Sequence, residues 1–252
     1  MAIRITEIWR HPIKSHGREL LDDVVLEAGA TMPWDRAWAV LHEASRFDRD
    51  NPEWAHCATF GRVAKAPELA AINTHFNAET GVMVLTHPRR APLEFSPASP
   101  TGEAEFIDWV TPLYPEGRVA PTGLAQVPGR GMTDSDYPSV SINSHASLRA
   151  LSQRAGREMS AMRFRGNIWI DGIAAWEEFD WVGKRLGIGG VVLEVVEPIE
   201  RCTATTANPE TGKVDFDTIR LLEEDYGHKD FGVRAVVITG GRIANGDELR
   251  LL

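Results

Sequence analysis

The first part of the chain alternates apolar and polar side chains at a period of two. Residues 3–9 follow this pattern, which is typical of a strand with one buried face, and Pro12 lies just beyond its end. Residues 23–27 and 37–42 show shorter runs of the same kind, separated by a turn at Gly29. We expect these three strands to form a small antiparallel sheet.

Between residues 51 and 131 the pattern is weaker. Residues 82–86 and 93–95 indicate short strands, and residues 103–114 indicate a helix with an apolar side formed by Phe106, Val110 and Leu113. Repeated Pro and Gly residues predict loops for the remainder. This stretch is expected to be a subdomain junction or a mobile region.

The second half has clearer elements. Ser144 is a good N-cap for a helix over residues 144–155. Residues 167–171, 191–196 and 234–239 are rich in apolar and β-branched side chains and predict strands, and Gly-Gly pairs suit the turns beside them. A turn and a last strand over residues 243–252 close the chain. The pattern as a whole predicts a mostly β fold with a few helices.

Composition narrows the class of protein. A chain of 252 residues with 43% hydrophobic and 25% charged residues suits one large β-rich domain or two packed subdomains. The formal charge of −9 gives no reason to expect binding to nucleic acid or to an anionic membrane, so an anionic ligand would need a local basic pocket. Neither a membrane-spanning apolar run nor a signal-peptide core is found, so we expect a cytoplasmic protein.

The chain has two cysteines, Cys57 and Cys202, which are far apart and form no Cys-x-x-Cys pair. This argues against a disulfide framework, a zinc site or an iron–sulfur cluster, and we expect both thiols to be free. Cys202 comes after a predicted strand, in a turn rich in threonine, and next to Arg201, whose charge would favour a metal-binding thiolate. A buried cysteine beside a loop is the structural alternative.

Three basic motifs could hold an anion. Lys14-Ser15, followed by Gly17, combines charge, a hydroxyl and turn N–H groups, although a solvated lysine would look the same. Arg36 could reach an anion or pair with its neighbour Asp35. Arg163-Phe164-Arg165-Gly166-Asn167 lies before a predicted strand and could clamp a planar or phosphorylated ligand, or form ordinary salt bridges.

Taken in order, these motifs resemble the MOSC family, named for the C-terminal domain of molybdenum cofactor sulfurase, and in particular its amidoxime-reducing-component-like branch. The matching motifs are His11-Pro12-Ile13-Lys14-Ser15, Asp35-Arg36-Ala37-Trp38-Ala39-Val40, Ser144-His145-Ala146-Ser147-Leu148, Phe164-Arg165-Gly166-Asn167, Arg201-Cys202 with Thr205-Thr206 and Pro209-Glu210-Thr211-Gly212, Phe231-Gly232 and Gly246-Asp247. The resemblance implies an N-terminal β-barrel-like region over about residues 1–120 packed against a MOSC β-barrel domain over residues 121–252.

The resemblance also implies a molybdenum-pterin cofactor (molybdopterin). Cys202 is similar to the cysteine that ligates molybdenum, and the residues similar to those that hold the pterin and its phosphate are Lys14, Ser15, Arg36, Arg165, Asn167 and Arg201. Cys57 has no counterpart role and is expected to be structural. Two positions depart from the family pattern: Asn208 replaces a frequent aspartate, and Arg234 stands where an aromatic residue is common.

The function implied is that of an oxidoreductase that reduces N-hydroxylated or related small substrates. The chain lacks a cysteine-rich ferredoxin-like tail, so a separate electron-transfer protein would supply the electrons. The alternative from another class is a non-catalytic cofactor carrier or a sulfur-transfer module that uses Cys202 as a persulfide with a separate desulfurase. A β-barrel scaffold without cofactor is the third possibility.

Overall fold

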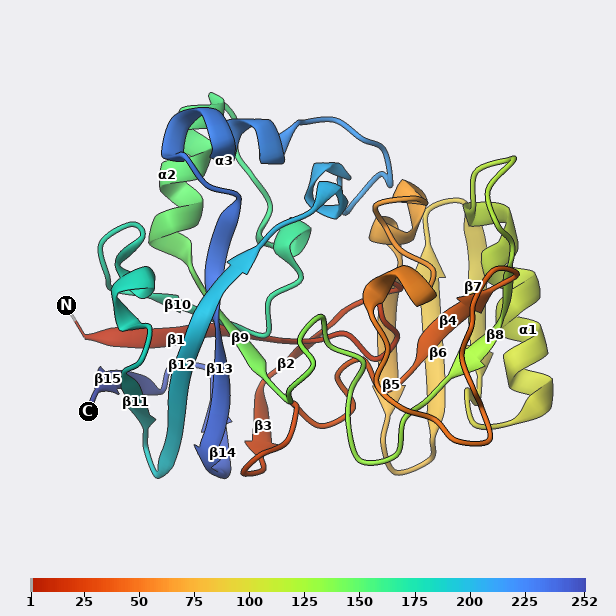
Figure 1. The fold of residues 1–252 in the computed structure, drawn as a ribbon, viewed down its shortest axis with the longest axis horizontal. Helices are drawn as coiled ribbons and strands as arrows, with labels where there is room; N and C mark the ends of the chain where they lie inside the picture. Colours follow the sequence, from red (N-terminus) through yellow and green to blue (C-terminus); the bar gives the residue numbers. More distant parts are fainter. Residues whose placement is uncertain (1) are drawn as a thin grey trace.

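The computed structural model describes residues 2–252, and they form two β units joined side by side (Figure 1). The strands and α-helices are β1 (Ile3–Arg10), β2 (Glu19–Leu21), β3 (Asp23–Leu26), β4 (Ala39–His42), β5 (Asn73–Asn77), β6 (Val82–His87), β7 (Arg90–Phe95), α1 (Pro100–Val110), β8 (Pro121–Ala125), β9 (Val140–Ser144), α2 (His145–Ala155), β10 (Ile168–Asp171), β11 (Arg185–Ile188), β12 (Val191–Glu200), α3 (Thr218–Tyr226), β13 (Asp230–Thr239), β14 (Gly241–Ala244) and β15 (Glu248–Leu251). Six short 3-10 helices lie between them: η1 (Cys57–Thr59), η2 (Pro67–Ala71), η3 (Thr111–Leu113), η4 (Ala161–Phe164), η5 (Glu177–Trp181) and η6 (Thr203–Thr206).

The larger unit is a closed seven-stranded barrel. Its strands follow the order β10-β9-β13-β12-β11-β15-β1, and the pairing of β1 with β10 closes the ring, while β2 extends β1 outside it. Neighbours in the ring are antiparallel except β9 and β10. Closure leaves few sheet edges exposed. The first and last strands of the chain, β1 and β15, lie side by side in this unit (Figure 1).

The smaller unit contains the three-stranded sheet β5-β6-β7, the pair β4-β8 and helix α1. It has a core of its own, with Phe76, Leu85, Phe106 and Val110 among its buried side chains. A mostly β fold with two packed β units, as predicted, is therefore confirmed.

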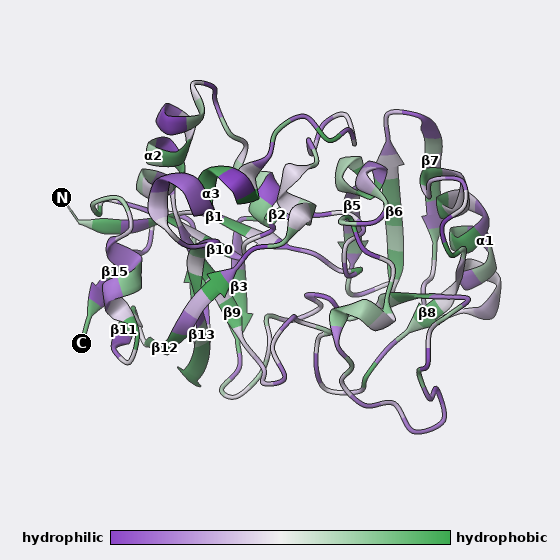
Figure 2. Ribbon diagram, turned by 45° about the horizontal axis from the view of Figure 1, so that its top comes forward, coloured by the Kyte–Doolittle hydropathy of each residue, from purple (hydrophilic) through white to green (hydrophobic). Residues whose placement is uncertain are grey.

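The alternation of side chains explains the barrel core. In β12, Val191, Leu193 and Val195 are buried, whereas Glu194 and Val196 between and after them are more exposed. Apolar strand positions converge inside the barrel, and the helices turn polar faces outward (Figure 2). Because β12 runs on to Glu200, it delivers Arg201 and Cys202 at the rim of the barrel.

The expectation of one small sheet at the start of the chain is wrong. β1 belongs to the barrel, β3 pairs with β14, and β4 pairs with β8. All three predicted strands exist, but none of them pairs with another, because β1 pairs with β2, β10 and β15 instead. Period-two patterns do not specify strand partners. The domain boundary near residue 120 stays a prediction. In the structure β1, from before this boundary, lies in the barrel, and β8, from after it, pairs with β4 in the smaller unit.

Two local predictions need correction. The helix predicted over 103–114 begins at Pro100, because Ser99 caps it and proline is well suited to its first position, and it continues after Val110 as the 3-10 turn η3. Residues 121–125, predicted as a loop, form β8, because pairing with β4 overrides the local proline and glycine signals. The predicted N-cap at Ser144 is confirmed, since its hydroxyl accepts from the N–H groups of Ala146 and Ser147.

Candidate functional site

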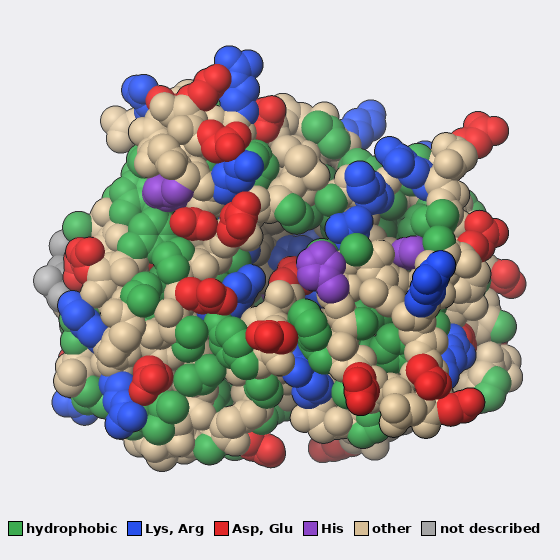
Figure 3. All heavy atoms as spheres, in the orientation of Figure 1, with side chains coloured by type: hydrophobic (Ala, Val, Ile, Leu, Met, Phe, Trp, Pro, Cys, Tyr) green, Lys and Arg blue, Asp and Glu red, His purple; other side chains and the backbone are tan. Residues whose placement is uncertain are grey.

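A basic pocket lies at the junction of the two units. Its lining residues come from distant parts of the chain: Arg36, Thr133, Asp134, Ser139, Ser141, Arg165, Asn167, Ile199, Arg201 and Arg234. Its volume is about 50 Å³, much smaller than a typical small-molecule site, and a hollow between the units has basic side chains at its floor (Figure 3). We call this the arginine pocket.

Lys14 reaches this pocket from the turn after β1. The side chain is buried, and Nζ donates to the carbonyl of Met132, at 2.7 Å, and to the carboxylate of Asp134. Ser15 follows it with a left-handed backbone, φ 65°, and is partly buried. Lys14 is thus placed against a pocket wall, whereas Ser15 is its chain neighbour and does not itself line the pocket.

Arg36 is held by buried partners on one side. One guanidinium nitrogen donates to the Asp35 carboxylate, and another donates to the carbonyl of Arg165 at 2.9 Å. Asp35 also accepts from the backbone N–H of His11 at 2.8 Å. Burial alone would raise the pKa of Asp35, but the charge of Arg36 and the contacts with His11 lower it well below its usual range. The structural pairing of Arg36 with Asp35 is therefore present, and Arg36 also lines the arginine pocket, while its role in anion binding stays a prediction.

Arg165 enters from the other unit, between η4 and β10. One terminal nitrogen donates to the carbonyl of Gly17 at 3.0 Å, which ties it to the turn that carries Lys14. Asn167 is buried, and its side chain is already committed, because Oδ1 accepts from Ser141 and Nδ2 donates to the carbonyl of Trp9. Asn167 lines the pocket chiefly as a brace, and Arg165 has free N–H groups for a ligand.

Backbone strain is concentrated here. Only five non-glycine residues of the described chain have positive φ, and three of them are the predicted site residues Ser15, Arg36 and Arg165. A left-handed backbone costs about 1–2 kcal/mol for a residue with a Cβ atom. Strained positions of this kind gather at functional sites, because the side chain is retained for a reason other than stability.

Arg201 is anchored by protein oxygens. It donates to the carbonyls of Phe231 and Phe164, at 2.8 and 2.7 Å, and to Oδ1 of Asn143 at 2.9 Å. Its guanidinium also lies 5.6 Å from the centre of the Phe164 ring. These contacts fix the position of Arg201 and therefore also the backbone position of Cys202, the next residue.

Asn143 was not predicted, and two glycines make room for it. A Cβ atom on Gly166 would lie 1.8 Å from its Nδ2, and one on Gly232 would lie 2.3 Å from its Oδ1. The two glycines occur in the motifs Phe164-Arg165-Gly166-Asn167 and Phe231-Gly232. The sequence therefore indicated a close contact through these glycines, but it did not indicate that Asn143 makes it. The Nδ2 atom has no partner in the described chain.

Cys202 is free and exposed, and it precedes η6. Its carbonyl accepts from the N–H and hydroxyl of Thr205, at 3.2 and 3.1 Å. It is not a lining residue of the arginine pocket but follows Arg201, which is. The structure thus excludes the reading of Cys202 as a small core residue. Cys57 is also free and is partly buried.

Two buried arginines hold the segment after Cys202. Arg163 donates to the carbonyls of Thr205 and Thr206 and forms an ion pair of 2.6 Å with Asp215. Arg18, just before β2, donates to the carbonyl of Pro209 at 2.9 Å and to that of Ala70, in the smaller unit, at 2.6 Å. The thiol therefore projects from a segment that is fastened to both units.

The pocket has an excess of positive charge. Four arginines and one carboxylate, that of Asp134, line it. Burial, followed by the charges of Arg36 and Arg18, lowers the pKa of Arg165 to about 9, and burial with the nearby Arg234 lowers the pKa of Arg201 to about 9. Because these cations repel one another, a bound anion would stabilise them.

Arg234 lines the pocket where an aromatic residue was expected from the family pattern. It donates to Glu197 at 2.6 Å, and the Tyr137 hydroxyl donates to the same oxygen at 2.7 Å. Asp134, Ser139 and Ser141 were not predicted as site residues, because they lie in a Gly- and Pro-flanked segment without periodicity. Only the pairing of β9 with β10 and β13 brings this segment to the pocket.

A buried histidine backs the Lys14 turn. Nδ1 of His16 donates to the carbonyl of Lys14, at 2.7 Å, and Nε2 accepts from the Tyr114 hydroxyl at 3.0 Å. Burial lowers the pKa of His16 to about 3 and that of His11 to about 3, so both rings are neutral. The two histidines are structural supports of the turn and supply no charge to the pocket.

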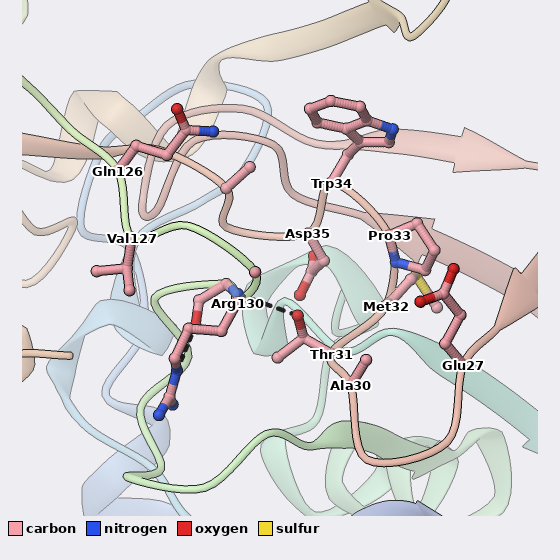
Figure 4. A pocket seen from close by; sticks show the side chains of 13 residues that line it. Glu27, Ala30, Thr31, Met32, Pro33, Trp34, Asp35, Gln126, Val127 and Arg130 are labelled. Carbon is pink, nitrogen blue, oxygen red and sulfur yellow. Dashed lines mark hydrogen bonds between the residues drawn. The ribbon is translucent and has the colours of Figure 1, made fainter. Parts of the chain in front are cut away.

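A second hollow adjoins the arginine pocket across Asp35. It lies between the 27–37 segment and the 126–131 segment, and the hydroxyl of Thr31 accepts from the N–H of Gly131 at 3.0 Å (Figure 4). Its walls include Trp34 and Arg130, and the latter is already hydrogen-bonded to the carbonyls of Ser135 and Asp136. This hollow therefore has little free charge to offer a ligand.

Within residues 2–252 there is no group of three or more His, Cys, Asp and Glu side chains that could hold a metal ion directly. A metal at this site would need ligands from a cofactor in addition to Cys202. None of the helices described is both long enough and apolar enough to cross a membrane.

Fold and site together define a two-unit β protein with an arginine-rich pocket at the junction of the units and a free, exposed thiol next in sequence to it. The MOSC N-terminal beta barrel domain matches residues 2–120, and the MOSC domain matches residues 131–250. The chain belongs to the MOSC family, in the group that combines these two domains.

Several known proteins resemble parts of the chain. Human mitochondrial amidoxime reducing component 2 is 39% identical over 89 residues, 34% of this chain and 26% of that protein, and human mitochondrial amidoxime-reducing component 1 is 34% identical over 130 residues, 47% of this chain and 38% of that protein. Molybdenum cofactor sulfurase from Drosophila yakuba is 33% identical over 35% of this chain and 11% of that protein. The matched stretches thus span well under half the length of these relatives. The solved YuaD protein from Bacillus subtilis covers 100% of this chain and 96% of its own, with 12% identity and a TM-score of 0.47.

Proposed function

We propose that this chain binds a molybdenum-pterin cofactor at the junction of its two units and reduces N-hydroxylated or related N-oxygenated small molecules. The observation that supports this best is the excess of arginine in one pocket, next in sequence to an exposed thiol. The named activities of the amidoxime reducing components, which match part of the chain, agree with it.

The residues present fit such a cofactor. The arginine pocket, of about 50 Å³, is too small for a whole pterin and would take only a small anionic group of the cofactor such as its phosphate. The N–H groups of Arg165 that have no protein acceptor are suited to phosphate oxygens. Lys14 and Arg36 would complete the phosphate site, with Ser15 holding the turn that carries Lys14. Arg201 would orient the ring system, and Asn167 would brace the pocket wall through Ser141 and Trp9. The exposed Cys202 would supply the protein sulfur ligand to molybdenum.

When bound, the cofactor supplies two-electron redox chemistry at molybdenum. Replacing an N–OH group by N–H consumes two electrons and two protons and releases water. We infer that a separate electron-transfer protein delivers the electrons. The protein's own contribution is to fix the thiol through Arg201 and Arg163 and to hold an anionic cofactor by its cations.

A second candidate is a cofactor carrier or sulfur-transfer module. The exposure of Cys202 supports it equally well, and part of the chain resembles molybdenum cofactor sulfurase. In this case Cys202 would accept a sulfur atom from a desulfurase as a persulfide and pass it on.

One experiment separates the candidates. The protein is purified from a host that makes the pterin cofactor, and molybdenum, cyanide-labile sulfur and reduction of an amidoxime by an artificial donor are measured. Stoichiometric molybdenum with turnover supports the reductase, and labile sulfur without metal supports the carrier. Absence of molybdenum and of labile sulfur would refute both. The same measurements on Cys202→Ala should show loss of turnover or of labile sulfur, and Cys57→Ala, the matched control, should behave like the wild type.

A further inference from the structure

The smaller unit has a pocket of its own, away from the arginine pocket. Its volume is about 320 Å³, within the range of small-molecule sites. The lining residues come from the end of β4, the segment around η1 and the turn after η3: His42, Ala58, Phe60, Gly61, Arg62, Lys65, Tyr114, Gly117, Arg118 and Val119. It shares no lining residue with the arginine pocket.

Three cations in this pocket have no acidic partner. Across residues 2–252, ion pairs within 4.0 Å account for many of the basic side chains, but none involves Arg62, Lys65 or Arg118. The one side-chain contact of Arg62 is a weak one, 3.7 Å to the sulfur of Cys57. In a chain with a formal charge of −9, three uncompensated cations around one cavity form a local basic site.

The remaining walls are apolar or lack a partner. Val119 is 42% exposed, and Tyr114, from the same turn, also lines the cavity, so the pocket offers apolar surface beside its charges. Nδ1 of His42 is buried without a hydrogen-bond partner in the described chain, while Nε2 is 3.4 Å from the carbonyl of Ala58.

We propose that this pocket binds a small organic phosphate. Arg62, Lys65 and Arg118 hold the phosphoryl group, because guanidinium and ammonium groups combine charge with several N–H donors. The carbon skeleton lies against Tyr114 and Val119. Inorganic phosphate alone would leave most of the cavity unfilled.

Phenyl phosphate is a suitable probe, because it joins a phosphoryl group to a flat apolar ring. Calorimetric titration of the full chain should show saturable binding of phenyl phosphate, weaker binding of inorganic phosphate and none of phenol. The double variant Arg62→Gln/Arg118→Gln should raise the Kd by about tenfold or more, equivalent to about 1.4 kcal/mol. Lys184→Gln, a change of an exposed basic residue on the barrel, should leave the Kd unchanged.

A crystal soaked with phenyl phosphate distinguishes the two basic pockets. Density beside Arg62 and Arg118 supports the proposal, and density confined to the pocket around Arg165 overturns it. The absence of saturable binding in the millimolar range, or an unchanged Kd in the double variant, also overturns it. Equal affinity for inorganic phosphate would refute the role of the apolar wall.

Discussion

The guanidinium of Arg36 donates a hydrogen bond of 2.9 Å to the backbone carbonyl of Arg165, which lies 129 positions further along the chain. Both residues have positive φ. The bond therefore joins two strained segments, one before β4 and one before β10, at the edge of a pocket rich in positive charge. Site geometry and the contact between the units depend on the same pair.

Arg165→Gly and Arg165→Ala separate the cost of the backbone from the use of the side chain. We expect the glycine variant to be more stable than the alanine variant by about 1 kcal/mol, because glycine adopts positive φ without a Cβ clash. Both should lose cofactor affinity equally. Urea denaturation with pterin and molybdenum analysis tests this, and equal stability of the two variants would contradict it.

Arg201→Gln should reduce the free energy of unfolding by about 3 kcal/mol, since it removes charged hydrogen bonds to the carbonyls of Phe164 and Phe231 and to Asn143. Arg201→Lys should recover part of the stability but not the forked geometry. The readout is the urea midpoint together with cofactor content. A lysine variant with full cofactor content would show that the fork is dispensable.

The cradle of Asn143 gives a more selective prediction. Gly166→Ala places a methyl group against its Nδ2 and should displace the side chain from Arg201. Gly156→Ala is the matched control, because it too is a glycine replacement but has open space around its Cβ position. We expect Gly166→Ala to lower cofactor content, whereas Gly156→Ala should lower only stability, because φ at Gly156 is 65°. Equal cofactor loss in the two variants would argue against the cradle.

Stability should fall in mild acid. His11 and His16 have pKa values lowered by burial to about 3, against 6.5 for an unperturbed group, so the unfolded chain binds protons that the folded chain does not. The contribution of these two neutral histidines to the free energy of unfolding is fully present above pH 6.5 and is lost as the pH falls toward 3. At pH 5 the loss is about 2 kcal/mol per histidine.

The difference between the urea denaturation midpoints at pH 7 and at pH 5 measures this effect. His16→Gln should make the difference smaller, even though the variant is less stable at both pH values. A difference as large as that of the wild type would mean that His16 does not remain neutral in the folded chain.

Part of this picture could be predicted from the sequence. Local patterns identified β1, β6, β12 and the N-cap of α2, because periodicity and capping depend on neighbouring residues. They did not identify the partners of β1, β3 and β4, because strand pairing depends on residues far away in the chain. The expected small sheet was wrong for this reason.

The site was predicted unevenly. The basic motifs around Lys14, Arg36 and Arg165 do meet in space. Each motif contains a residue with positive φ, namely Ser15, Arg36 or Arg165, so each marks a tight backbone turn. Asp134, Ser141 and Asn143 were missed, since a buried polar residue in a strand or loop has no pattern of its own. Their contacts with Lys14, Asn167 and Arg201 become visible only in three dimensions.

X-ray absorption at the molybdenum edge tests the central claim most directly. The proposed function predicts that wild-type protein from a cofactor-producing host has one more sulfur around molybdenum than Cys202→Ser, while pterin content remains similar in both. Cys57→Ser should match the wild type. An unchanged number of sulfur neighbours in Cys202→Ser, or no molybdenum in any of the three proteins, would contradict the account.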